Sequence, residues 1–102
     1  MVLLEFSVSP LGAGESVSAY VARAVELVAA SGLDYRLHAM GTIVEGELDQ
    51  VLALMQRCIE AVAADCPRVT CSAKLDYRRG ARGRLDAKVQ SVVDKVGHAL
   101  KT

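Results

Sequence analysis

Apolar and polar side chains alternate in three stretches of the chain, with the period of two that is typical of half-buried β-strands. These stretches are residues 2–8, 34–40 and 69–77. Gly41, which permits a tight turn, follows the second stretch, and the short run 42–45 after it fits a further strand. The pattern therefore predicts four strands.

Three other stretches repeat apolar side chains at intervals of three and four residues, as one face of an α-helix does. They span residues 17–28, 48–63 and 85–100. Ser16 is suited to cap the start of the first helix, and Gly32 is a natural residue to follow its end. The pattern therefore predicts three helices.

The resulting order is β-α-β-β-α-β-α, and its first six elements match the ferredoxin-like pattern. We therefore predict an α+β fold, a ferredoxin-like βαββαβ sandwich with an antiparallel four-stranded sheet and an additional C-terminal helix. A single domain over residues 1–102 accommodates these elements. Right-handed crossovers place the first and third strands at the centre of the sheet. Two helices cover one face of the sheet, so we expect the third helix or another subunit to cover the other face.

The charge balance argues against a nucleic-acid partner. Twelve basic and twelve acidic residues give a formal net charge of zero, and only 4% of the residues are aromatic. Nucleic-acid binders need excess positive charge, and single-strand binders need stacking aromatics. A local cluster of arginines could still form an RNA or phosphate clamp, although a solvated loop or salt bridges to a neighbouring subunit is the simpler interpretation. The cluster is Arg78, Arg79, Arg82 and Arg84.

The sequence also argues against a membrane partner and a metal site. No apolar stretch approaches the roughly 18 residues of a membrane span. The three cysteines form no C-x-x-C pair, and no histidine lies close to them in sequence. We therefore expect no metal site, no disulfide framework and a cytoplasmic location. Cys58 and Cys71 lie in apolar rows and are expected to pack in the core.

The predicted topology brings polar residues together at one end of the sheet. The first strand ends near Ser9 and the second near Met40, and the third strand begins at this end near Thr42. Glu45 lies further along the third strand, away from this end. Side chains alternate between the two faces of a strand, so a regular strand cannot direct both Thr42 and Glu45, which are an odd number of residues apart, to one face. A bulge, or Thr42 in the turn, would reconcile them. We expect a small ligand to touch Ser9, Met40, Thr42 and Glu45, with a merely solvated sheet face as the alternative.

Several segments resemble the small thiamine-binding protein family of the YkoF-like superfamily. The most specific is Met-Gly-Thr-Ile-Val-Glu-Gly at residues 40–46, and residues 7–12, 31–35 and 74–78 also match. The resemblance extends from the first strand to Val92. It implies a ferredoxin-like fold, assembly into homodimers and homotetramers through sheets and helices, and binding of thiamine or its pyrimidine moiety without known catalysis.

The candidate residues suit such a ligand. Glu45 or Glu5 can accept a hydrogen bond from a protonated pyrimidine nitrogen or neutralise the cationic thiazolium ring. The hydroxyls of Ser9 and Thr42 can meet the exocyclic amine, and Met40 supplies a polarisable apolar contact. Among the carboxylates, Glu45 is the one expected to matter, because a charged residue in a short central strand is costly unless paired or solvated.

Two other classes of function compete with ligand binding. One is a regulatory or protein-interaction module of ferredoxin-like fold that has no small-molecule ligand. The other is a small acylphosphatase-like hydrolase, which is disfavoured because no serine lies in a G-x-S-x-G elbow and Gly12-Ala13-Gly14 is an incomplete phosphate loop. We therefore expect no catalytic residues and no cofactor.

Self-association is a separate expectation. Leu54 and Ala61 widen the apolar stripe of the second helix beyond the width that one sheet face needs, and the third helix has an apolar stripe of its own. Burial of these stripes against copies of the chain predicts a homodimer or homotetramer.

Overall fold

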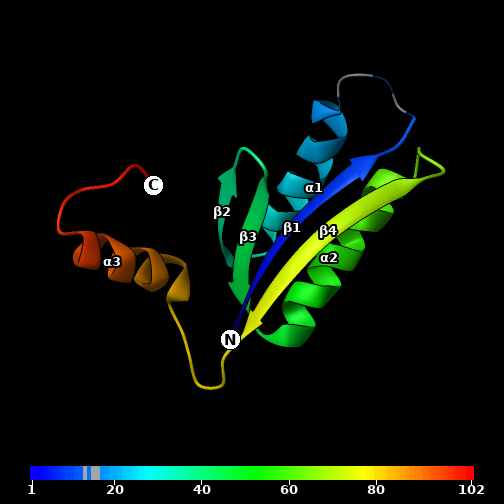
Figure 1. Ribbon diagram of the computed structural model, residues 1–102. Helices are drawn as coiled ribbons and strands as arrows, with labels where there is room; N and C mark the ends of the chain where they lie inside the picture. Colours follow the sequence, from blue (N-terminus) through cyan, green and yellow to red (C-terminus); the bar gives the residue numbers. More distant parts are fainter. Residues whose placement is uncertain (13, 15–16) are drawn as a thin grey trace.

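The fold is the ferredoxin-like α+β sandwich that the alternation predicts. The computed structural model describes residues 1–12, 14 and 17–102, so Ser16 and Ala13 of the glycine-rich loop lie outside the described residues. Figure 1 shows the seven elements in the expected order. They are β1 (Val2–Pro10), α1 (Ser18–Ala30), β2 (Asp34–His38), β3 (Gly41–Gly46), α2 (Leu48–Ala63), β4 (Val69–Tyr77) and α3 (Arg84–Val96).

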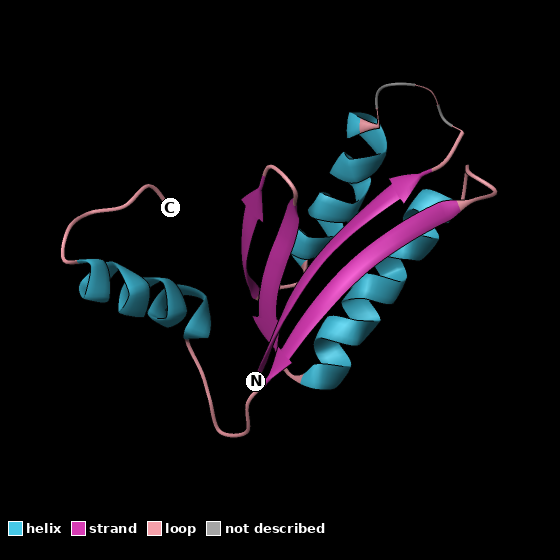
Figure 2. Cartoon of the chain, viewed as in Figure 1, coloured by secondary structure: helices cyan, strands magenta, loops and turns pink. Residues whose placement is uncertain are grey.

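The four strands form one antiparallel sheet in the order β2-β3-β1-β4. The first and third strands are therefore central, as the right-handed crossovers predict. The second strand ends at His38 rather than at residue 40, because Ala39 and Met40 form the turn into β3. Helices α1 and α2 lie side by side on one face of the sheet (Figure 2). We call this the helix face and the opposite one the outer face.

The core lies between the helix face and the two helices. The even-numbered row of β1 enters it completely, with Val2, Leu4, Phe6 and Val8 all buried. Leu54 is also fully buried, although the sequence suggested that it belongs to an interface. The reason is that α2 packs against α1 as well as the sheet, so it buries a wider stripe than one sheet face requires.

Strand β4 is less covered than its alternation suggests. Its odd-numbered row faces the helix side, opposite the buried row of β1. Leu75 is nevertheless 39% exposed and Tyr77 58% exposed, and Cys71 is exposed rather than in the core. Because β4 is the edge strand, the two helices shield the central strands more than they shield it.

Helix α3 leaves the body of the molecule instead of covering the outer face (Figure 1). It packs mainly against β2 and β3 and is tied to Asp76 of β4 by Arg84 and Lys88, and of the helix residues Arg84 and Leu85 are buried. The radius of gyration is 14.9 Å, above the roughly 13 Å of a compact chain of this length. The helix ends at Val96, earlier than the apolar pattern suggests, because Gly97 adopts a left-handed conformation with φ of 85°.

We expect Leu54→Ala to lower the free energy of unfolding by about 2–5 kcal/mol, because the leucine is fully buried and its loss leaves a cavity. Urea unfolding at a fixed protein concentration measures the change. Gln56→Ala is the matched control on the exposed side of the same helix, with an expected change within about 0.5 kcal/mol. Equal losses for the two variants would contradict this packing of α2.

A cavity between α1 and the open edge of β1

Strand β1 is longer than the strand beside it, and this leaves part of its edge unpaired. Its pairing with β4 continues to Pro10, whereas its pairing with β3 stops at Phe6, opposite Thr42. Within the described part of the chain, the main-chain groups of residues 7–10 on the β3 side therefore have no strand partner. Unpaired main-chain donors and acceptors are rare in protein interiors and are available to a ligand.

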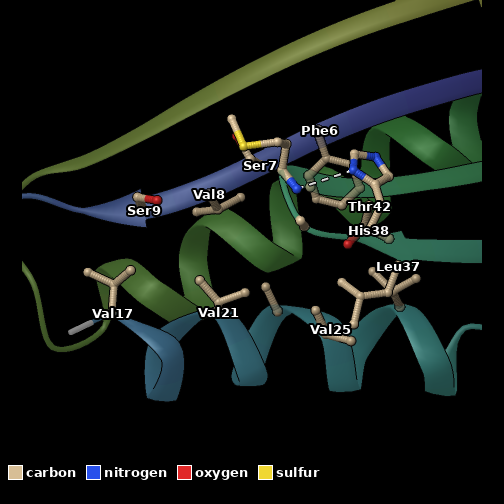
Figure 3. Close-up of a pocket in the computed structure, with 15 residues that line it drawn as sticks. Phe6, Ser7, Val8, Ser9, Val17, Val21, Val25, Leu37, His38 and Thr42 are labelled. Atoms are coloured by element: carbon tan, nitrogen blue, oxygen red, sulfur yellow. Dashed lines mark hydrogen bonds between the residues drawn. The ribbon is translucent and has the colours of Figure 1, made fainter.

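A cavity of about 240 Å³ opens beside this edge, between the sheet and α1. Figure 3 shows Val21 and Val25 of α1 pointing toward the sheet, with Phe6 and Leu37 on the other side. The wall is mostly apolar. Its polar members are Ser7, Ser9, His38 and Thr42. A flat ring with one or two polar atoms is the kind of molecule that such a cavity accepts.

Thr42 is the buried polar group of the cavity. Only 5% of the residue is exposed, and its hydroxyl has no hydrogen-bond partner among the described residues. Thr42 pairs with Phe6 and so lies on the helix face, without a bulge in β3. Among the described residues, the Thr42 hydroxyl is not one of the buried side-chain polar atoms left without a partner, so it is accessible from the cavity and can form a hydrogen bond to a ligand there.

The turn between β2 and β3 forms the rim of the cavity. The side chain of Met40 is 84% exposed there. Gly41 fits against β1 so closely that a Cβ atom in its place would lie 2.9 Å from the carbonyl oxygen of Phe6. The glycine is thus required for the rim to approach β1.

His38 holds this turn in place. Its Nδ1 accepts a hydrogen bond from the backbone N–H of Met40 at 3.3 Å (Figure 3), and its Nε2 lies 3.3 Å from Oε2 of Glu5 on the outer face. The sequence offered no signal for this arrangement, since a lone histidine on a mixed face is most simply a polar surface residue.

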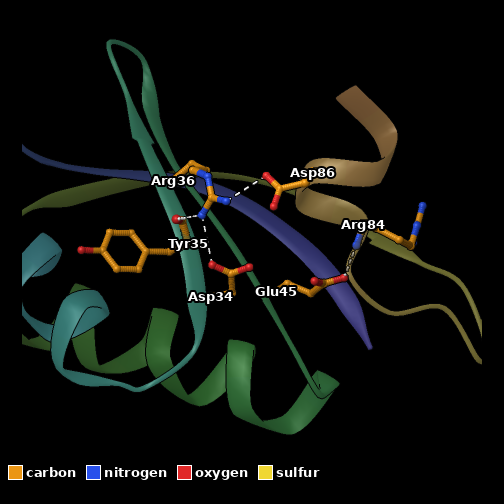
Figure 4. Close-up of polar contacts among 6 residues, drawn as sticks. All are labelled: Asp34, Tyr35, Arg36, Glu45, Arg84 and Asp86. Carbon is orange, nitrogen blue, oxygen red and sulfur yellow. Dashed lines mark hydrogen bonds and ion pairs between the residues drawn. The ribbon is translucent and has the colours of Figure 1, made fainter. Parts of the chain in front are cut away.

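Three of the four expected ligand residues line the cavity together: Ser9, Met40 and Thr42. Glu45 does not. It pairs with Leu3 and lies on the outer face, 6% exposed, where its carboxylate accepts a hydrogen bond from the backbone N–H of Arg84 at 2.9 Å (Figure 4). Arg84 begins α3, so Glu45 satisfies one of the free N–H groups at the start of that helix. A role for Glu45 in ligand binding stays a prediction.

Two further ion-pair groups attach α3 to the sheet. Arg36 on β2 contacts Asp34 and also Asp86 of α3, the latter at 2.8 Å (Figure 4). Asp76 on β4 accepts hydrogen bonds from Lys88 and Arg84, and these partners lower the pKa of its carboxyl. Among the described residues, no group of three or more His, Cys, Asp or Glu side chains could hold a metal ion.

The comparisons with known proteins agree with this architecture. A sequence model of the family described as "Thiamine-binding protein" matches residues 4–93. The chain belongs to the thiamine-binding protein family. Among its relatives, UPF0045 protein Mb1933 of Mycobacterium bovis is 45% identical over 92 residues, covering 89% of this chain and 90% of the relative.

Two solved structures are similar in fold. The crystal structure of protein MJ1052 from Methanocaldococcus jannaschii has a TM-score of 0.83 at 36% identity, covering 89% of this chain and 94% of that one. TM0486 from Thermotoga maritima, whose name provisionally assigns it to thiamine biosynthesis or salvage, has a TM-score of 0.78. Its identity is 21%, with 89% of this chain and 97% of that chain covered, so it supports the fold alone.

We expect alkylation by iodoacetamide to modify Cys71 well before Cys58. Cys71 is exposed, whereas Cys58 is buried and burial raises the pKa of its thiol to about 11, which keeps it in the unreactive protonated form. Mass spectrometry of peptides after timed labelling measures the order. Labelling of Cys58 in the folded protein at the rate of Cys71 would contradict the packing of α2 against the core.

Proposed function

We propose that the chain is a non-catalytic binding protein for thiamine or a related pyrimidine or thiazole metabolite, and that the cavity beside Thr42 is its site. The observation that carries the proposal is the hydroxyl of Thr42, which faces a mostly apolar cavity and makes no hydrogen bond within the described residues, in a chain of the thiamine-binding protein family. An aminopyrimidine ring offers an exocyclic amine and ring nitrogens as partners for that hydroxyl. Ser9 and Met40 contact the ligand at the rim.

The chemistry of the cavity supports binding rather than catalysis. His38 is the titratable side chain in the described lining, and both of its ring nitrogens are occupied, by the Met40 N–H and by the Glu5 carboxylate. A general base needs a free nitrogen within reach of its substrate. We place the protein in the cytoplasm because its three cysteines are free thiols. In the described residues, no helix is long and apolar enough to span a membrane.

We expect Thr42→Val to weaken the binding of thiamine about five- to thirtyfold, because valine keeps the shape of threonine but loses its hydrogen bond, which is worth about 1–2 kcal/mol in a buried site. Isothermal titration calorimetry measures the affinity. Thr70→Val is the matched control, because Thr70 is exposed at the same end of the sheet and does not line the cavity. Unchanged affinity of Thr42→Val would show that the site lies elsewhere.

Glu45→Gln provides a second comparison in the same titration. The sequence-based hypothesis expects a loss of about tenfold to a hundredfold, the value of a charge-assisted hydrogen bond to the ligand. The observed position of Glu45, outside the cavity and against the first turn of α3, instead predicts unchanged affinity together with a lower free energy of unfolding. A loss of thiamine affinity would assign the Glu45 carboxylate to the ligand, whereas a loss of stability alone would assign it to the start of α3.

The exposed apolar surfaces support self-association. The stripe on α3 is exposed by 44–56% at Val89, Val92 and Val96, and Leu100, beyond the end of the helix, is 39% exposed. Large apolar side chains are also exposed on α2, at Leu48 and Leu52, and on β4, at Leu75 and Tyr77. A small chain that leaves this much apolar surface in water gains free energy by burying it against copies of itself.

We expect a homodimer or homotetramer in multi-angle light scattering at micromolar concentration. Val92→Glu should shift the population toward the monomer, because it places a charge in the apolar stripe of α3. Ser91→Glu adds the same charge at an exposed position one residue away, off the stripe, and should leave the mass unchanged. A monomeric wild-type protein would refute the proposed assembly and would favour a different use for α3.

A further inference from the structure

A second hollow adjoins the cavity on the outer face of the sheet. Its volume is about 370 Å³, and its lining includes Glu5, Ser7, Met40, Ser72 and Lys74. We call it the outer hollow. Ser7 and Met40 line both the cavity and the outer hollow, so the two adjoin across the open edge of β1, where β3 no longer pairs with it.

The two spaces differ in polarity. The cavity is walled by valine, leucine and phenylalanine side chains, whereas the outer hollow carries two charged groups and two hydroxyls. Glu5 and Lys74 are direct neighbours in the register of β1 and β4, as are Ser7 and Ser72. A ligand that occupies both spaces therefore has one end in an apolar setting and the other beside charges.

Glu5 has no lysine or arginine ion-pair partner among the described residues. Its contact is with Nε2 of His38 at 3.3 Å, while Nδ1 of the same ring accepts a hydrogen bond from the Met40 N–H. Two positively charged side chains, Lys74 and Arg36, lie on the same face of the sheet as Glu5. Lys74 makes no ion pair within the described part of the chain, and Arg36 on β2 is already bound by Asp34 and Asp86.

We propose that Glu5 is the specificity-determining carboxylate of the site: it provides the counter-charge for the cationic end of a two-ring ligand whose neutral ring lies in the cavity beside Thr42. The inference rests on the proposed function and adds the class of ligand to it. The cation lies past Met40, in the outer hollow, and His38 positions the carboxylate by its contact at 3.3 Å. Glu5 thereby takes the role that the sequence suggested for Glu45, because Glu5 lines the outer hollow beside the cavity, whereas the Glu45 carboxylate faces the first turn of α3.

Two ligands separate this electrostatic role from binding in general. Thiamine carries the cationic thiazolium ring, and hydroxymethylpyrimidine lacks it. Calorimetry at mildly alkaline pH, where the aminopyrimidine is neutral, should show that Glu5→Gln weakens thiamine binding about three- to tenfold and leaves the affinity for hydroxymethylpyrimidine unchanged. The effect is modest because Glu5 is half exposed and its charge is screened by solvent.

Lys74→Gln is the matched variant of opposite sign. It removes the positive charge that faces Glu5 across the strands, so thiamine should bind slightly more tightly and hydroxymethylpyrimidine should be unaffected. Added salt should reduce both effects on thiamine binding.

The outcomes distinguish the two proposals. If Glu5→Gln weakens both ligands equally, or leaves thiamine unaffected, the role of Glu5 is refuted while the cavity remains the site. If the wild-type protein binds hydroxymethylpyrimidine but not thiamine, the inference about a cationic end is also refuted. If it binds neither ligand, the proposed function fails and this inference fails with it.

Discussion

The pairing of β1 with two neighbours of unequal length is the constraint on which the rest of the structure depends. On one side β4 accompanies β1 to its end, and on the other β3 stops four residues earlier. A central strand normally has both edges satisfied, so the shortfall leaves main-chain groups and a gap in the layer beside α1. The cavity, its open rim and the position of the outer hollow beside it all follow from that mismatch.

The turn between β2 and β3 sets the width of the opening between the end of β3 and the unpaired edge of β1. Gly41 allows the turn to approach the Phe6 carbonyl more closely than any side chain would permit, and His38 ties the Met40 backbone to Glu5 on β1. Together these contacts hold an exposed methionine at the edge of the cavity. The geometry thus explains the Met-Gly-Thr segment, because its consecutive residues supply the rim of the cavity, a close backbone approach to β1 and a hydroxyl that faces the cavity.

Glu45 lies near the other end of β3 and contacts α3 instead of the cavity. Its carboxylate lies at the N-terminus of α3, where the helix dipole and a free N–H group favour a negative charge. With the ion pairs of Arg36 and Asp76, it directs α3 away from the body of the molecule. One short strand therefore carries the buried polar group of the cavity on one face and the anchor of the projecting helix on the other.

The strands, the helices, their order and the central place of β1 were all predictable from the sequence, because periods of two and 3.6 residues and the handedness of crossovers are local properties of the chain. The convergence of Ser9, Met40 and Thr42 followed from that topology. The sequence could not show that Val21, Val25 and Leu37 border a cavity, because side chains that line an empty space have the same pattern as side chains that fill one. Only the tertiary structure placed Glu5 in the outer hollow beside the cavity and Glu45 at the start of α3, since these positions depend on where β3 ends and on which side α3 begins. Both are set by contacts between residues far apart in the chain, and these leave no periodic signal in the sequence.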